Sequence, residues 1–65
     1  MRLGDALEAL WESGIPIRRS AWPPEQTLVL DEHGKIIGAR DGDHWEYGLA
    51  WWEFDALDWE LLTRR

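Results

Sequence analysis

The apolar positions at the start of the chain repeat with the period of an α-helix. Leucine and alanine recur at spacings of three and four residues over residues 3–13, with acidic side chains between them. This spacing predicts an amphipathic helix with one apolar stripe, to which Trp11 belongs. Gly14 can end the helix in the left-handed conformation, and Pro16 prevents its continuation. We therefore expect a helix over residues 3–13 with Trp11 in the core.

Beyond this helix the pattern changes to short apolar runs separated by turn residues. Residues 27–30 and 35–39 are β-rich runs around a turn at 31–34, and this arrangement predicts a hairpin because Gly34 can supply the positive φ that such turns need. The other predicted elements, in chain order, are a strand at 15–19, a proline-fixed loop at 20–25, a turn at 41–43, a strand beginning within 44–47, a short helix within 49–57, a closing strand at 58–63 and a solvated tail of Arg64 and Arg65.

The order of these elements predicts an α+β fold, in which a small antiparallel sheet packs with an N-terminal helix and a short second helix. The length allows a single domain over residues 1–65. The chain has no cysteine, which excludes disulfides and cysteine-ligated metals. A net charge of −6 argues against nucleic acid and anionic membranes as partners. The absence of a membrane-length apolar run and of a signal peptide predicts a cytoplasmic protein.

Six tryptophans are a large number for 65 residues. At roughly 150–250 Å² each they could bury on the order of 1,000 Å² in total, and a domain this small has little interior for six indoles. Some of them are therefore expected at a subunit interface or in a ligand pocket, which favours a homo-oligomer. Trp59, on the closing strand, is expected in the core, whereas Trp45, Trp51 and Trp52 are divided between a pocket and an interface.

One candidate binding constellation combines Arg18, Arg19 and Trp22 at the junction of a strand and a loop. An arginine fork beside an indole can hold a phosphate and stack a base at the same time. The alternative interpretation is a solvent-facing arginine pair beside a core tryptophan, and the spacing alone favours that alternative.

A second aromatic cluster lies between residues 45 and 54, where Tyr47 and Phe54 accompany three tryptophans. Adjacent Trp51 and Trp52 cannot share one helix face, because neighbouring residues point about 100° apart. If one of them is in the core, the other faces outward or contacts a partner. The alternative, in which both pack within one sheet–helix core, remains open at this point.

Residues that would indicate catalysis or a metal site are scarce. The only serines, Ser13 and Ser20, fall at a helix end and in a loop, and no serine–histidine–acid arrangement can be assembled from them. His33 and His44 are too few for a typical structural metal site, and residues 41–43 are a turn rather than a calcium loop. We therefore expect a binding protein without a cofactor, and not an enzyme.

Three segments, in order, resemble a known family. Residues 3–10, followed by Gly14, resemble an opening of the form Phe-Gly-acid-Ala-Leu-x-x-Leu and a helix-ending glycine. Residues 16–22 resemble a following basic–apolar–Arg-x-x-Trp motif, and residues 55–62 resemble a closing Ala-x-Asp-Trp-Glu signature. This order is similar to that of the small phage proteins known as the second type of Thoeris anti-defence protein.

The resemblance implies a sponge: a phage protein that binds a cyclic nucleotide second messenger of a bacterial antiphage system and sequesters it without cleaving it. The implied ligand is a glycocyclic ADP-ribose or a cyclic dinucleotide, and the implied assembly is a homotetramer, or a dimer, in the host cytoplasm. Arg19 and Trp22 match the Arg-x-x-Trp motif, and Asp58 and Trp59 match the closing motif in a structural role. The candidate ligand-binding residues are Arg18, Arg19, Trp22, Trp45, Tyr47 and Trp52. An acidic protein can bind a dianionic ligand if its few cations converge on the pocket, and the candidates are Arg18, Arg19, Lys35 and Arg40.

The excess of acids motivates a competing hypothesis of a different class. An acidic inhibitor could block a host defence protein by imitating nucleic-acid phosphates. The carboxylates that would do so are Asp41, Asp43, Glu46 and Glu53. This hypothesis predicts salt-sensitive binding to a host protein that does not depend on Arg19.

Overall fold

Helix α1 (Leu3–Ser13) forms where the apolar period predicts it. The structure, a computed structural model, describes residues 1–62. Leu3, Ala6 and Leu10 are buried on one side of the helix. Gly14 ends it in the left-handed conformation, with φ of 66°, and its backbone N–H donates to the carbonyl of Leu10. The helix is thereby confirmed together with its C-terminal cap.

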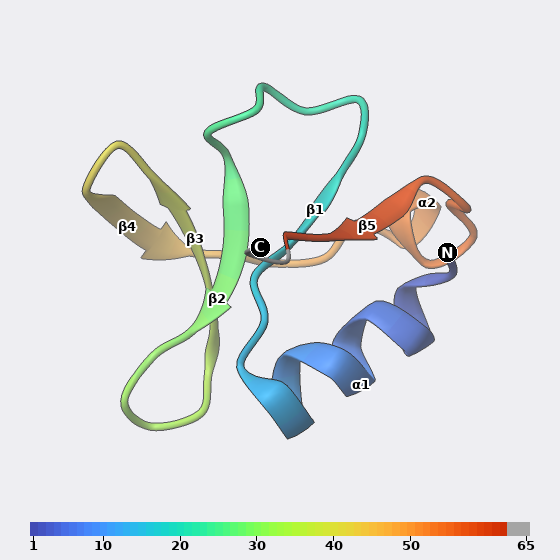
Figure 1. The fold of residues 1–65 in the computed structure, drawn as a ribbon. Helices are drawn as coiled ribbons and strands as arrows, with labels where there is room; N and C mark the ends of the chain where they lie inside the picture. Colours follow the sequence, from blue (N-terminus) through green and yellow to red (C-terminus); the bar gives the residue numbers. More distant parts are fainter. Residues whose placement is uncertain (63–65) are drawn as a thin grey trace.

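Five strands form one antiparallel sheet in the order β4-β3-β2-β1-β5 (Figure 1). Their bounds are Ile17–Arg19 for β1, Thr27–Leu30 for β2, Ile36–Arg40 for β3, Asp43–Glu46 for β4 and Trp59–Leu61 for β5. A short helix, α2 (Trp51–Phe54), precedes β5. The predicted α+β class is therefore confirmed. The last residue of the predicted closing strand, Thr63, and the predicted tail, Arg64 and Arg65, lie outside the described residues.

The strand register assigns side chains to the two faces of the sheet. Ile17 of β1 pairs with Leu28 of β2 and with Leu61 of β5, and Arg19 pairs with Trp59. Because paired residues point to the same side of a sheet, Ile17, Leu28 and Trp59 share one face, and all three are buried. Helix α1 packs on this face against β1, β2 and β5. The core thus lies between α1 and one half of the sheet.

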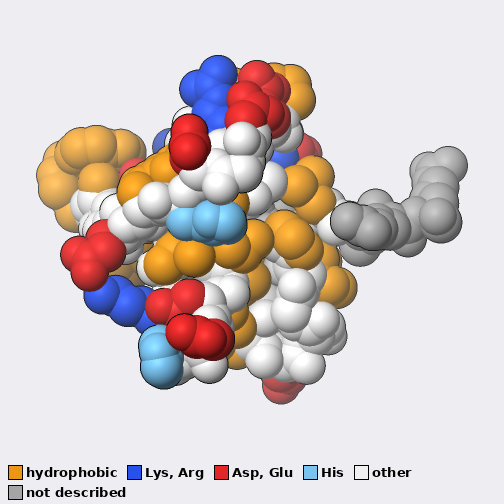
Figure 2. All heavy atoms as spheres, turned by 90° about the vertical axis from the view of Figure 1, so that its left-hand side faces the viewer, with side chains coloured by type: hydrophobic (Ala, Val, Ile, Leu, Met, Phe, Trp, Pro, Cys, Tyr) orange, Lys and Arg blue, Asp and Glu red, His pale blue; other side chains and the backbone are white. Residues whose placement is uncertain are grey.

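The opposite face of the sheet carries a strip of smaller apolar side chains. Val29 of β2 pairs with Ile37 of β3, and Ala39 follows on the same face, each half-buried. Figure 2, which views the molecule from the β4 side, shows hydrophobic side chains across the middle of that side, with acidic side chains around them.

Among residues 1–62, no helix has both the length and the apolar character needed to cross a membrane.

Trp11 does not lie in the core, and that prediction is wrong. Its side chain is 54% exposed, whereas Leu10 is fully buried. Each residue advances about 100° around a helix, so Trp11 lies about 100° away from Leu10, which is at the centre of the buried stripe. Trp59, in contrast, is 2% exposed, and its predicted core position is confirmed.

The interpretation in which Trp51 and Trp52 both pack in a sheet–helix core is also wrong for this fold. Trp51 is 75% exposed and Trp52 is 57% exposed. The inward position of α2 belongs instead to Glu53, which is buried. The two indoles contact each other edge-on, with ring centroids 5.7 Å apart. Neither tryptophan of the pair contributes to the buried core.

Candidate functional site

Trp22 occupies the centre of a group of aromatic rings beside the core. It follows β1 in a tight turn, in which its backbone N–H donates to the carbonyl of Arg19 over 3.0 Å. Its indole meets Trp59 edge-on at a centroid distance of 5.4 Å and Tyr47 at 5.7 Å. Trp22 itself is half-buried. Two neighbours from distant parts of the chain therefore hold an indole that still reaches the surface.

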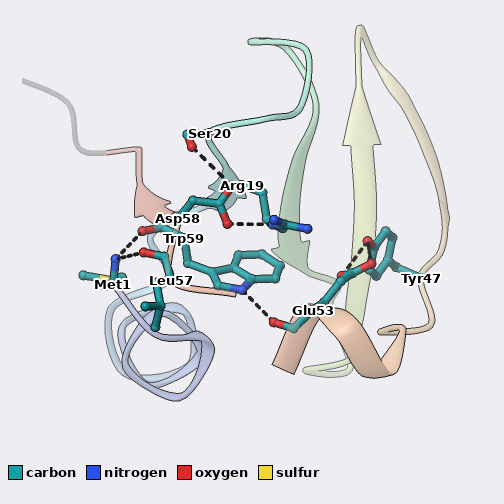
Figure 3. Close-up of polar contacts among 8 residues, drawn as sticks. All are labelled: Met1, Arg19, Ser20, Tyr47, Glu53, Leu57, Asp58 and Trp59. Atoms are coloured by element: carbon teal, nitrogen blue, oxygen red, sulfur yellow. Dashed lines mark hydrogen bonds and ion pairs between the residues drawn. The ribbon is translucent and has the colours of Figure 1, made fainter. Parts of the chain in front are cut away.

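Arg19 lies on the same face of the sheet as Trp59 and is held by a carboxylate. Its Nε donates to Oδ1 of Asp58 over 2.8 Å, and the Ser20 hydroxyl donates to the other oxygen of that carboxylate over 3.2 Å (Figure 3). The hydrogen bond from Arg19 holds the pKa of Asp58 below its ordinary value of 3.8. Asp58, which the closing motif placed in a structural role, thus positions Arg19.

Glu53 contributes a buried carboxylate to the same region. The Tyr47 hydroxyl donates its one proton to the carboxylate of Glu53, whose two oxygens lie 2.8 and 2.9 Å from it (Figure 3). The backbone carbonyl of Glu53 accepts a hydrogen bond of 3.1 Å from the indole N–H of Trp59. Glu53 therefore links α2 both to β5 and to the segment after β4. We call Arg19, Trp22, Tyr47, Glu53 and Trp59 the Trp22 cluster.

The amino group of Met1 is hydrogen-bonded to the segment that carries Asp58. It donates to the carbonyl oxygens of Leu57 and Trp59, at 2.9 Å each, and the backbone N–H of Trp59 donates back to the Met1 carbonyl over 3.2 Å (Figure 3). These bonds join the start of α1 to the start of β5. The backbone that carries Asp58 is consequently held on both sides of that residue.

Arg18 lies on the opposite face of the sheet from Arg19, because successive strand residues alternate. It is 8% exposed, and its guanidinium donates to the carboxylate of Glu60 and to the backbone carbonyl of Trp22. The interpretation of a solvent-facing arginine pair is therefore wrong for Arg18. Its contacts support the loop that carries Trp22, while its Nε has no hydrogen-bond partner within residues 1–62.

The other predicted site residues are not gathered at the Trp22 cluster. Trp45 lies on β4, two strands from β2, with its ring over Gly38. Trp52 lies on α2, where its ring contact is with Trp51. Of the predicted ligand-binding set, the structure brings together Arg19, Trp22 and Tyr47.

Within one chain, the four candidate cations do not converge on the Trp22 cluster. Arg18 and Arg19 point to opposite faces, and the other two cations are held by carboxylates elsewhere on the sheet. Lys35 pairs with Glu46 at 2.9 Å, and Arg40 lies 3.5 Å from Glu25. A strongly acidic chain supplies a carboxylate near most of its cations, so these charges are distributed rather than focused.

The acidic surface that the competing inhibitor hypothesis requires is also not assembled. Glu53 is 7% exposed and cannot present a charge to a partner. Glu46 is engaged by Lys35, and that hydrogen bond lowers the pKa of Glu46 from its ordinary value. Asp41, in the turn after β3, and Asp43, the first residue of β4, remain exposed. Two carboxylates make a much smaller acidic surface than four.

Glu53 is the member of the Trp22 cluster that the sequence placed wrongly, as an exposed phosphate mimic of the acidic inhibitor, whereas it is buried. A glutamate between Trp52 and Phe54 in an acidic chain looks like an ordinary surface residue. The only local signal is that it stands in the middle of an aromatic segment. Its inward orientation follows from Tyr47 and Trp59, each six residues away along the chain, which offer hydrogen bonds to it.

Tyr47 is expected to titrate only at very alkaline pH. Burial raises its pKa above the ordinary value of 10.0, and the hydrogen bond to Glu53 raises it further. A raised pKa favours the protonated phenol in the folded state, so its contribution to stability is complete below pH 10 and is lost as the pH rises through the folded pKa. Because the chain has one tyrosine, the ultraviolet absorbance of tyrosinate measures this directly.

The absorbance should show no tyrosinate at pH 10 in the native protein, and half tyrosinate at that pH in the urea-unfolded protein. Glu53→Gln removes the negative charge, and it should lower the pKa of Tyr47 while keeping a hydrogen-bond acceptor. Asp55→Asn, which removes an exposed charge nearby in sequence, is the matched control. Identical titrations of native and unfolded protein would contradict the buried Tyr47–Glu53 contact.

The Trp22 cluster combines an accessible indole, a positioned guanidinium and a buried carboxylate. This set can bind a planar ring and a polar or anionic group. Among residues 1–62, no group of three or more histidine, aspartate or glutamate side chains could hold a metal ion. Comparisons with protein-family models, with curated proteins and with solved structures found no match. Any role of the Trp22 cluster must therefore be inferred from its own chemistry.

Proposed function

We propose that this protein binds a cyclic nucleotide second messenger in the host cytoplasm and sequesters it without cleaving it, so that a bacterial immune effector is not activated. The observation that carries the proposal is the pairing of half-buried Trp22 with Arg19, two residues that are three apart in the chain and held together by the turn after β1. The similarity to phage anti-defence sponges points to the same two residues. A glycocyclic ADP-ribose or a cyclic dinucleotide is the proposed ligand.

The chemistry of the two residues suits such a ligand. An indole offers a stacking surface to any nucleobase, and this kind of contact is worth about 1–3 kcal/mol per base. Trp22 is held by Trp59 and Tyr47 before a ligand arrives, and preorganisation of this kind reduces the entropy lost on binding. A guanidinium has five N–H donors. Asp58 engages Arg19 through Nε, so a ligand phosphate can share the same guanidinium.

Isothermal titration calorimetry of the purified protein tests the proposal. The titrants are the cyclic ADP-ribose isomers and a panel of cyclic dinucleotides. We expect one of them to bind, and Arg19→Ala to weaken that binding by at least about a hundredfold, since it removes a charge-assisted hydrogen bond and leaves Asp58 facing the anion. Trp22→Ala should have an effect of similar size. Trp11→Ala, which truncates an exposed tryptophan on α1, is the matched control and should bind like the wild type.

Circular dichroism of each variant separates lost binding from lost folding. Arg19→Lys keeps the charge near Asp58 and should recover part of the affinity if Arg19 binds the ligand electrostatically. Absence of heat with every titrant, at protein concentrations well above micromolar, would refute the proposal. Recovery of cleaved rather than intact ligand after heat denaturation would show an enzyme. Salt-sensitive binding of a host protein, unchanged in Arg19→Ala, would support the acidic inhibitor.

A further inference from the structure

The backbone of Trp22 is held by both of the arginines that precede it. Its N–H donates to the carbonyl of Arg19 over 3.0 Å, and its own carbonyl accepts a hydrogen bond from the guanidinium of Arg18. The next residue, Pro23, has no N–H to donate and a fixed φ, and its carbonyl accepts from the N–H of Gln26 over 3.0 Å. Of the bonds that fix this turn, the one from Arg18 is made by a side chain.

Arg18 binds this carbonyl from the face of the sheet that is opposite to Arg19. Successive strand residues point to opposite faces, whereas the Trp22 indole contacts Trp59, which shares its face with Arg19. The guanidinium of Arg18 donates through Nη2 to the Trp22 carbonyl and through Nη1 to the carboxylate of Glu60, its cross-strand neighbour. A ligand between Arg19 and the indole would therefore lie on the far side of the sheet from Arg18.

The burial of Arg18 contributes little stability by itself. Its side chain is 10% exposed, and its Nε is buried without a hydrogen-bond partner among residues 1–62. The removal of a guanidinium from water costs free energy, which can exceed the gain from its attraction to a carboxylate such as that of Glu60. Because the guanidinium is a rigid planar fork, however, two bonds fix both its position and its orientation. The specific effect of Arg18 is therefore a fixed position for the Trp22 carbonyl.

We propose that Arg18 is a positioning residue, which holds the Trp22 indole in the orientation that accepts a ligand base and does not touch the ligand. As far as it concerns ligand affinity, this inference rests on the proposed function. The bond from Arg18 to the Trp22 carbonyl exists without a ligand, so the order that it imposes on the turn can be measured separately. An indole that is already ordered loses less entropy on binding, and its release should weaken binding.

Two variants separate the bond to Trp22 from the ion pair. Arg18→Lys keeps a positive charge beside Glu60, but an ammonium is a point charge that lacks the fork needed to hold two acceptors at once. Glu60→Gln is the matched control, because it weakens the same ion pair, keeps an acceptor for Nη1 and leaves the bond from Nη2 to the Trp22 carbonyl. If Arg18 acted only through its ion pair, the two variants should behave alike.

Amide hydrogen exchange, followed by nuclear magnetic resonance, tests the positioning without a ligand. The reference is the amide of Leu10, a fully buried residue of α1 that reports global unfolding. In Arg18→Lys the Trp22 N–H should exchange at least about tenfold faster relative to Leu10, whereas in Glu60→Gln the ratio should stay within about twofold of the wild type. Equal ratios in the wild type and Arg18→Lys would overturn the proposal.

Calorimetry with the cyclic ADP-ribose isomers and cyclic dinucleotides tests the effect on affinity. Arg18→Lys should raise the Kd by at least about tenfold, and Glu60→Gln should change it by less than about twofold. In a Trp22→Ala background, Arg18→Lys should have no further effect, because it acts through that indole. An effect that persists in this background would mean that Arg18 touches the ligand, and it would overturn the proposal.

Two other binding results would also overturn it. Equal losses of affinity in Arg18→Lys and Glu60→Gln would show that the ion pair alone matters, and unchanged affinity in Arg18→Lys would show that the order of the turn does not affect binding. If no titrant binds the wild type, the proposed function fails, and the exchange ratio of Trp22 to Leu10 alone decides whether Arg18 positions the turn. Circular dichroism shows that each variant is folded.

Discussion

Replacement of Trp59 with alanine is expected to leave the chain largely unfolded at room temperature. Trp59 is 2% exposed, and it is the largest fully buried side chain in the core. Truncation of a buried tryptophan to alanine costs about 3–5 kcal/mol. The total stability expected for 65 residues is about 3–10 kcal/mol. The substitution also removes the N–H that the Glu53 carbonyl accepts and the ring against which Trp22 packs.

Urea denaturation followed by far-ultraviolet circular dichroism measures this effect. Trp59→Ala should show no cooperative transition, or one displaced by most of the wild-type stability. Trp59→Phe keeps much of the buried area and should cost less. Trp11→Ala applies the same truncation to an indole on α1 that is 54% exposed, and surface changes of this kind usually stay within about 0.5 kcal/mol. Equal effects at positions 11 and 59 would show that Trp59 is not the centre of the core.

Gly38→Ala is expected to destabilise the protein by about 1–3 kcal/mol, as overpacking usually does. Gly38 lies on β3 opposite Trp45 of β4. A β-carbon at position 38 would lie 2.5 Å from Nε1 and 2.7 Å from Cζ2 of the Trp45 indole. The ring therefore occupies the space that any larger side chain would need. The methyl group can be accommodated only if the indole leaves the sheet or the two strands move apart.

A double-mutant cycle isolates this contact. In a Trp45→Ala background the extra methyl group meets no indole, and Gly38→Ala should then change the free energy of unfolding by less than about 0.5 kcal/mol. Gly4→Ala is the control for a simple glycine effect, because nothing lies within 4 Å of its β-carbon position. In the first turn of a helix this change should be neutral or stabilising by up to about 1 kcal/mol. If the cost at position 38 is the same with and without Trp45, the ring does not lie over the glycine.

The elements of the fold were predictable wherever the information is local. The apolar period of residues 3–13 and the left-handed Gly14 define α1, and a glycine turn defines the β2–β3 hairpin. The position of Trp11 was not predictable in the same way, because the stripe on α1 is wide enough to include it. Whether a residue at the margin of this stripe is buried depends on how much of the helix surface the sheet covers. Only the tertiary structure contains that information.

The candidate site was predictable in part for the same reason. Arg19 and Trp22 are three residues apart, so a local motif identifies them, and the turn after β1 keeps them together. Arg18 is buried with a hydrogen-bond partner, Glu60, that lies 42 residues away in the chain. Glu53 is buried with Tyr47, six residues away, as its partner. Composition alone predicts that charged residues are exposed. This prediction is wrong where the fold supplies a hydrogen-bond partner for a charged side chain.

The strand order predicts an order of assembly for the domain. The β2, β3 and β4 strands follow one another through short turns, so their pairs close small loops. The pairing of β1 with β5 joins Arg18 to Glu60 across most of the chain. Long loops cost more entropy to close, and contacts distant in sequence slow folding. The three-stranded meander is therefore expected to form first. The pairing of β5 with β1 is expected last, so Trp22 should acquire Trp59 as its neighbour only in the final step of folding.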